Sequence, residues 1–149
     1  MTKKILIVGA NYYKDILSDL TIQAKVVLLE KHSKEKIKDK WIKVPGVFEI
    51  PVVIAKNIKK YDGFIALGCV IKGETPHFDF ISQATINAIM KLSVENNKPI
   101  GNGIITCLNK EQAIVRSKTK GQEAAEAVLS VLGFKILIKV KLSKILELL

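Results

Sequence analysis

Short apolar runs alternate with amphipathic stretches along most of this chain. The runs are rich in Ile and Val, which is typical of buried parallel strands, and we expect strands over residues 4–8, 41–44, 64–71 and 100–107. Between them, apolar residues recur at helical spacing, which predicts helices over residues 15–30, 50–60, 77–96, 109–116 and 121–132. Because strands that alternate with helices form right-handed βαβ units, the pattern predicts an α/β fold, a three-layer α/β/α sandwich around a parallel four-stranded sheet.

The end of the chain fits two kinds of element. Ile136, Ile138, Val140 and Leu142 alternate as in a strand, whereas Ile138, Leu142, Ile145, Leu146 and Leu149 fit a helix. Neither a repeat nor a linker divides the 149 residues, and a chain of that length buries roughly 70% of its unfolded surface in one domain. We therefore expect a single domain over residues 1–149, in which residues 135–149 form a tail of undecided structure.

The formal net charge of +10 raises the hypothesis of a nucleic-acid-binding protein. The composition argues against it, because 23 of the 24 cationic residues are lysines scattered along the chain and aromatic residues make up only 6%. Nucleic-acid-binding proteins usually exploit the guanidinium group of arginine. We therefore prefer a solvated lysine-rich surface and expect no nucleic-acid partner.

Neither a membrane span nor a metal site is expected. No apolar run approaches the roughly 20 residues that a span needs, and the run at residues 5–9 is too short for a signal peptide, so we expect a cytoplasmic protein without a membrane partner. Cys69 and Cys107 each follow an apolar run and lack metal-ligand spacing, which favours buried thiols. A catalytic thiolate at Cys69 stays open, because a nearby cation would activate it.

In an open parallel sheet, ligands bind outside the carboxyl ends of the strands. Four segments follow the predicted strands, at residues 9–13, 44–49, 70–77 and 102–108. The first carries Tyr12 and Tyr13, which can stack on a planar heterocycle or be ordinary core or surface side chains. The second places Val47, Phe48 and Glu49 after a Pro-Gly bend. Its backbone amides can bind the edge of a heterocycle, or the bend can be purely structural.

The third segment combines the features of a phosphate site. Gly73-Glu74-Thr75-Pro76-His77 places a flexible glycine, a hydroxyl group and successive backbone N–H groups at the start of a helix, where the helix dipole attracts anions. Histidine suits proton transfer near neutral pH, which makes His77 a candidate acid–base group. The alternative is that Thr75 only caps the helix and His77 packs on it.

Arg116 is the only arginine in the sequence. A guanidinium group binds phosphate through two parallel hydrogen bonds, whereas lysine offers a point charge, so a lone arginine indicates a geometric need. Lys120 lies four residues on and shares a helix face with Arg116 if the stretch between them stays helical. A surface ion pair of Arg116 with Glu111 or Glu123 is the alternative.

Together, three motifs resemble the 6,7-dimethyl-8-ribityllumazine synthase family. They are Val-Pro-Gly-Val-Phe-Glu-Ile-Pro at residues 44–51, Leu-Gly-Cys-Val-Ile-Lys-Gly-Glu-Thr-Pro-His-Phe-Asp-Phe at residues 67–80, and Glu-Gln-Ala-Ile-Val-Arg at residues 111–116. The resemblance reaches about residue 133 and implies a flavodoxin-like fold. It also implies a transferase without metal or organic cofactor. This enzyme condenses 5-amino-6-(D-ribitylamino)uracil with 3,4-dihydroxy-2-butanone 4-phosphate in the penultimate step of riboflavin biosynthesis.

A flavodoxin-like module that holds a flavin or a phosphate without turning it over is the alternative to this enzyme. A proton donor at His77 favours the enzyme, since binding alone needs none.

The resemblance also implies the roles of individual residues. Tyr12 matches the aromatic side chain that stacks on the pyrimidine, and His77 matches the acid–base group. Two loops match the binding site of the ribityl-uracil, with Val47, Phe48, Glu49, Cys69, Val70 and Ile71. Phosphate-binding positions are matched by Glu74, Thr75 and Arg116, with Lys120 at the place of a further basic residue. Asn102 stands where the family usually has a phenylalanine that a neighbouring subunit adds to the pyrimidine pocket, and an amide there can contact the substrate.

Members of this family are ring pentamers or capsids of twelve pentamers, in which neighbouring subunits share each site. The sequence lacks the extra N-terminal strand of many capsid-forming members, which favours an isolated homopentamer. Residues 117–121, which form the connection before the last predicted helix, are several residues shorter than the corresponding connection in the family. The apolar residues of the tail favour burial between rings instead. We expect a pentamer as the minimum active unit, and riboflavin synthase is a further hypothetical partner.

Overall fold

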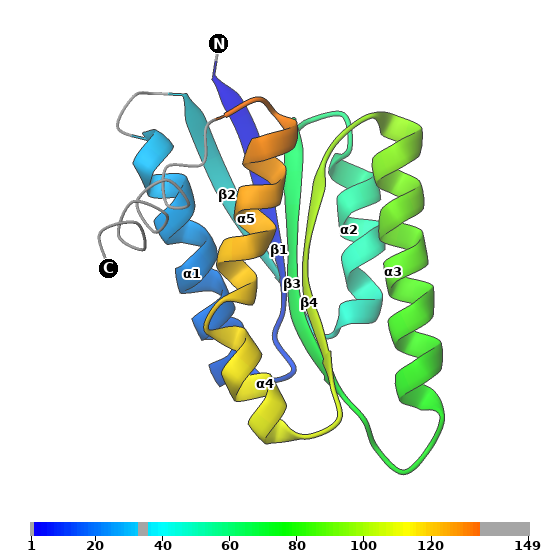
Figure 1. Ribbon diagram of the computed structural model, residues 1–149. Coiled ribbons are helices and arrows are strands. Elements are labelled where there is room, and N and C mark those ends of the chain that lie inside the picture. The colour runs from blue at the N-terminus through cyan, green and yellow to red at the C-terminus, as the bar shows by residue number, and fades with distance from the viewer. Residues whose placement is uncertain (1, 33–35, 135–149) are drawn as a thin grey trace, which may run out of the picture.

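The computed structural model describes residues 2–32 and 36–134. Its strands lie parallel in one sheet, in the order β2-β1-β3-β4 (Figure 1). They are β1 (Lys3–Ala10), β2 (Ile37–Val44), β3 (Gly63–Ile71) and β4 (Ile100–Cys107). The chain leaves β1 toward one edge of the sheet and leaves β3 toward the other, so a crevice is expected between the carboxyl ends of β1 and β3.

Helices cover both faces of the sheet (Figure 1). One face carries α1 (Lys14–His32), α4 (Lys110–Ser117) and α5 (Lys120–Val131). The other carries α2 (Ile50–Asn57), which follows a short 3₁₀ turn η1 (Val47–Glu49), and α3 (His77–Asn96). None of the helices in the described residues is long and apolar enough to cross a membrane. The predicted three-layer α/β/α sandwich of flavodoxin-like topology is confirmed.

Two apolar clusters hold the layers together, one on each face of the sheet. In β1, Ile5 and Ile7 belong to the cluster with α1 and α5, whereas Leu6 and Val8 belong to the opposite one, and all four side chains are fully buried. Successive side chains of a strand point to opposite faces, so a strand covered on both sides is apolar at every position. This explains the continuous apolar runs of the sequence.

The observed bounds differ from the predicted ones mainly at β2. This strand begins at Ile37, four residues before the predicted start. It lies at an edge of the sheet, where Lys38 and Lys40 are exposed, so its first half shows no apolar run. α2 ends at Asn57 rather than at residue 60. The tail at residues 135–149, for which a strand and a helix stayed open, lies outside the described residues.

The backbones of α1 and α5 come very close at Gly121. A Cβ atom at this position would lie 2.1 Å from the backbone oxygen of Leu20. Only glycine leaves room for such an approach. The contact seats α5 on α1 and therefore also constrains α4, which precedes α5 and carries Arg116 in its last turn.

Candidate active site

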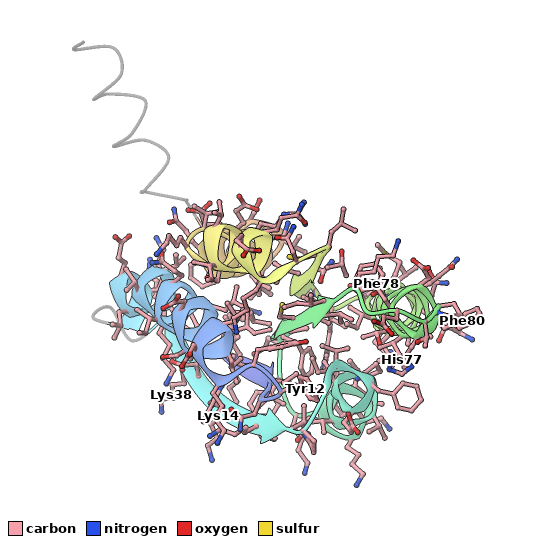
Figure 2. The ribbon with its side chains drawn as sticks, turned by 90° about the horizontal axis from the view of Figure 1, so that it is seen from below. Tyr12, Lys14, Lys38, His77, Phe78 and Phe80 are labelled. Carbon is pink, nitrogen blue, oxygen red and sulfur yellow. The ribbon has the colours of Figure 1, made fainter. Side chains whose placement is uncertain are left out.

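A pocket of about 550 Å³ opens at the carboxyl ends of β1 and β3, where the strand order reverses. Its volume is typical of a site for a small molecule. The residues that line it are Tyr12, Tyr13, Gly46, Val47, Phe48, Glu49, Cys69, Val70, Ile71, His77 and Ile81. Figure 2 looks onto this end of the molecule, where Tyr12 from the end of β1 and His77 from the start of α3 are labelled. The structure thus brings together predicted residues that lie far apart in the sequence.

The end of β3 offers unpaired backbone groups to this pocket. Its pairing with β1 stops at Leu67, opposite Gly9, whereas β3 itself continues to Ile71. The last residues pair only with β4 on the other side. Backbone N–H and C=O groups on the β1 side of residues 68–71 are therefore available to a ligand, and buried polar groups of this kind require a partner.

The turn before α2 is held against β3. Val47 is buried and leans on Gly68, where a Cβ atom would lie 2.8 Å from the Val47 Cγ1 atom. The backbone N–H of Glu49 donates a hydrogen bond to the carbonyl oxygen of Gly46 at 3.2 Å. Phe48, between the two, is 66% exposed and borders the open side of the pocket. The Pro-Gly bend is thus structural and also lines the site.

Tyr12 and Tyr13 contact each other edge to face, with ring centroids 4.9 Å apart and ring planes at 73°. Tyr12 is 75% exposed, whereas Tyr13 is half-buried and packs against the core. Burial raises the pKa of Tyr13, and the neighbouring Tyr12 and Cys69 add to the increase, so its hydroxyl group is protonated at neutral pH. An exposed ring on a fixed support is suited to stack on a planar ligand.

Cys69 lines the pocket as a neutral thiol. Burial raises its pKa to about 12; Cys107 contributes to the increase, and Lys110 acts in the opposite direction. Both cysteines are buried and free, as predicted. Because the thiolate is the reactive form of cysteine, the structure does not support a catalytic thiolate at Cys69 near neutral pH.

The loop before α3 borders the pocket without lining it. Thr75 and Glu74 are exposed, and no atom lies within 4 Å of a Cβ atom built at Gly73, so the loop is open to solvent. The backbone N–H of His77 donates a long hydrogen bond of 3.4 Å to the Thr75 hydroxyl oxygen. Thr75 therefore contributes to the helix start, whereas His77 lines the pocket instead of packing only on its own helix.

Arg116 and Lys120 do not line the pocket of their own chain. The Arg116 Nη1 atom donates a hydrogen bond to the carbonyl oxygen of Thr106 at 2.9 Å, and the described residues contain no ion pair between Arg116 and either predicted glutamate. Lys120 pairs with Glu123 at 3.4 Å. The stretch between Arg116 and Lys120 is not one helix, because α4 ends at Ser117 and α5 begins at Lys120. The condition for a shared helix face is not met.

Asn102 is the third of the 8 residues of β4, opposite Ala66, rather than at the carboxyl end of the strand. Its side-chain oxygen accepts a hydrogen bond from the backbone N–H of Ile104 at 3.1 Å. The side chain is exposed at an edge of the sheet and does not line the pocket of its own chain.

Three lining residues were not among the predicted site residues. Tyr13 was noted beside Tyr12 without a role of its own, and Gly46 belongs to the recognised bend. Ile81 follows His77 by four residues on α3 and therefore shares its helix face. That spacing is the signal that would have identified it.

A larger depression of about 1110 Å³ lies at the opposite ends of the strands. Its charged lining residues are Lys4, Lys38, Asp39, Lys40, Lys59 and Lys60, and no predicted site residue lines it. Ligands of an open parallel sheet bind at the carboxyl ends of the strands, so we place the site in the smaller pocket. Within the part of the chain that the structure describes, no group of three or more His, Cys, Asp or Glu side chains could hold a metal ion.

Comparisons with known proteins agree with the family resemblance of the three motifs. The family model described as 6,7-dimethyl-8-ribityllumazine synthase matches residues 2–135. Relatives of that name include the proteins of Bartonella tribocorum (44% identical over 91% of this chain and 93% of the relative) and Agrobacterium fabrum (42%, over 88% and 93%). The protein of Methylorubrum populi is 40% identical over 89% of this chain and 82% of its own length. The chain therefore belongs to the 6,7-dimethyl-8-ribityllumazine synthase family.

Proposed function

We propose that this protein condenses 5-amino-6-(D-ribitylamino)uracil with 3,4-dihydroxy-2-butanone 4-phosphate to 6,7-dimethyl-8-ribityllumazine, the penultimate step of riboflavin biosynthesis. The observation that carries the proposal is a single pocket with an exposed aromatic ring, a carboxylate, unpaired strand ends and a histidine. It accords with the family to which the chain belongs. The reaction joins amine nitrogens to carbon atoms of the ketone, releases water and eliminates phosphate, and it uses no metal or organic cofactor.

Each element of the pocket has a part in this proposal. Tyr12 stacks on the pyrimidine, and the unpaired backbone groups of residues 69–71 bind its edge. Glu49, beside Val47 and Phe48, accepts hydrogen bonds from the ribityl hydroxyl groups, because an ionised carboxylate is an acceptor only. His77 transfers protons as the amine attacks the carbonyl carbon and water and phosphate leave.

The phosphate group of the ketone requires cationic and N–H donors. The start of α3 supplies backbone N–H groups and the positive end of the helix dipole next to Glu74 and Thr75. Arg116 and Lys120 do not line the pocket of their own chain, so in this proposal a neighbouring subunit supplies them, together with Asn102.

A ring of subunits also accounts for apolar surface on α3. Phe80, Met90 and Val94 share one face of this helix and are 70%, 62% and 66% exposed. Figure 2 shows Phe80 on the side of α3 that points away from the sheet. Exposed apolar side chains gathered on one helix face favour coverage by another copy, and we propose a homopentamer as the minimum active unit. A cytoplasmic location and association with riboflavin synthase stay predictions.

The test is lumazine formation followed by absorbance, with the two proposed substrates and the purified full-length protein. We expect turnover by an assembly of at least five chains, measured by sedimentation at micromolar protein concentration. A protein that binds flavin or phosphate but forms no lumazine would refute the proposed reaction. A fully active monomer would refute the shared site, and a single capsid-sized species would refute the isolated pentamer.

A further inference from the structure

The ring of Tyr12 is exposed and has little to hold it in place. The side chain is 75% exposed. Within the described residues, the only aromatic ring that it contacts is that of Tyr13. An exposed side chain that samples several rotamers loses that freedom when a ligand binds, which weakens binding. Support that fixes the ring beforehand therefore strengthens binding.

Tyr13 provides such support because it is anchored on several sides. It packs against the core, and its backbone oxygen accepts a hydrogen bond from the N–H of Leu17 at 3.0 Å, in the first turn of α1. The two rings meet edge to face, a geometry that contributes about 0.5–1.5 kcal/mol beyond burial. The orientation of Tyr13 thus restricts the orientation of Tyr12.

Lys110, the first residue of α4, contacts the ring of Tyr13. Its Nζ atom lies 5.2 Å from the centroid of the Tyr13 ring, within the range of a cation–π contact. The side chain of Asn109 caps α4 by accepting a hydrogen bond from the N–H of Gln112 at 2.9 Å, which fixes the backbone at Lys110. A cation in the first turn is unfavourable to a helix, so the ring contact offsets a local disadvantage.

We propose that Lys110 and Tyr13 act as positioning residues, which hold the Tyr12 ring in the orientation that stacks on the pyrimidine. The contacts run in series from α4 through Tyr13 to Tyr12, so Lys110 acts only through the ring of Tyr13. Neither residue transfers a proton or binds phosphate. The inference rests on the proposed function, since it takes the pyrimidine as the ligand of Tyr12.

The size of the effect follows from the two contacts. An exposed cation–π contact contributes about 0.5–1 kcal/mol, so Lys110→Met should weaken binding of the pyrimidine about 2- to 5-fold. Tyr13→Leu removes the ring and should weaken it about 3- to 10-fold. In both variants kcat at saturation should change much less than the KM for the uracil, because the reacting groups are untouched.

The experiment is calorimetric titration of the full-length protein with 5-amino-6-(D-ribitylamino)uracil and, separately, with inorganic phosphate. The variants are Lys110→Met, Tyr13→Leu and the double variant. Lys110→Arg and Tyr13→Phe keep the cation and the ring, and should recover most of the affinity. Lys118→Met removes an exposed lysine just after the same helix and serves as the control, with unchanged affinity expected.

The double variant decides the order of the contacts. If Lys110 acts through Tyr13, the double variant binds the uracil as weakly as Tyr13→Leu alone. Independent additive losses, or weaker binding of phosphate in Lys110→Met, would overturn the proposal. So would unchanged uracil affinity in Lys110→Met, a surface change that does not threaten folding. A wild-type protein that binds no uracil would instead refute the proposed function itself.

Discussion

Replacement of Gly121 by alanine sets two effects of known size against each other. Alanine is a better helix former than glycine by about 1 kcal/mol, and by less at Gly121, which is the second residue of α5. Against this gain, the new Cβ atom would lie 2.1 Å from the backbone oxygen of Leu20. Carbon and oxygen atoms ordinarily approach to about 3.3 Å, so the helices must separate by roughly 1 Å.

The atoms nearest to the new Cβ all belong to the backbone of Leu20, so none of them can rotate away. Overpacking of a well-packed contact costs typically about 1–3 kcal/mol, so we expect Gly121→Ala to lower the free energy of unfolding by about 1–2 kcal/mol after the helix-propensity gain. For a chain of this size, that corresponds to a fall in Tm of roughly 3–8 °C.

Thermal unfolding followed by circular dichroism measures this change. All variants should be compared at one protein concentration, because assembly makes Tm depend on concentration. Gly73→Ala is the matched control for stability, since nothing lies within 4 Å of a Cβ atom at that position, and its Tm should stay within about 2 °C of the wild type. A Gly121→Ala protein as stable as the wild type, or more so, would show that α1 and α5 separate without loss and would refute the reasoning.

Three further predictions concern the site. His77→Ala should lower kcat roughly 10²- to 10⁴-fold at neutral pH. The loss should lie at the low end of this range if the condensation is easy without the enzyme. An unchanged rate from pH 6 to 9 would remove His77 from the mechanism. Arg116→Lys should weaken binding of the phosphorylated ketone by about 1.5–3 kcal/mol and binding of the uracil far less, and equal calorimetric affinities of both proteins for inorganic phosphate would contradict this. Cys69, with its pKa raised to about 12, should resist alkylation at pH 8 in the folded protein. Rapid alkylation of the folded protein would argue against a buried thiol. The raised pKa also implies that burial of the neutral Cys69 thiol contributes to stability in full below the pKa of the unfolded thiol, near 9. This contribution is lost as the pH rises toward 12.

The sequence predicted most clearly the strand whose residues are buried on both sides. β3 appears as an almost entirely apolar run, and the amphipathic helix α3 begins and ends at the predicted residues. The first half of β2 was missed because the helices leave this strand partly uncovered, so Lys38 and Lys40 are exposed and no apolar run marks them. An apolar pattern marks buried positions, so it cannot mark a part of a strand whose side chains are exposed.

The pocket was predictable to the extent that it consists of strand ends. Tyr12, Glu49 and His77 lie on three segments that a parallel sheet must bring together at one edge, whatever the details of packing. Arg116 and Asn102 do not line that pocket in their own chain, and their positions depend on how α4 and the edge strand β4 pack. No local sequence pattern encodes either, and the edge-to-face contact of Tyr12 with Tyr13 depends on side-chain rotamers that the sequence does not specify.

The two outer strands of the sheet differ in how they discourage pairing with a foreign strand. β2 presents exposed Lys38, Lys40 and Lys43, whose mutual repulsion opposes the approach of an identical edge. On β4 the amide oxygen of Asn102 occupies the N–H of Ile104, a donor that an incoming strand would otherwise use. We therefore expect acetylation of the β2 lysines, or Asn102→Val, to make the altered edge pair more readily with a foreign strand and so to promote fibrillar aggregation.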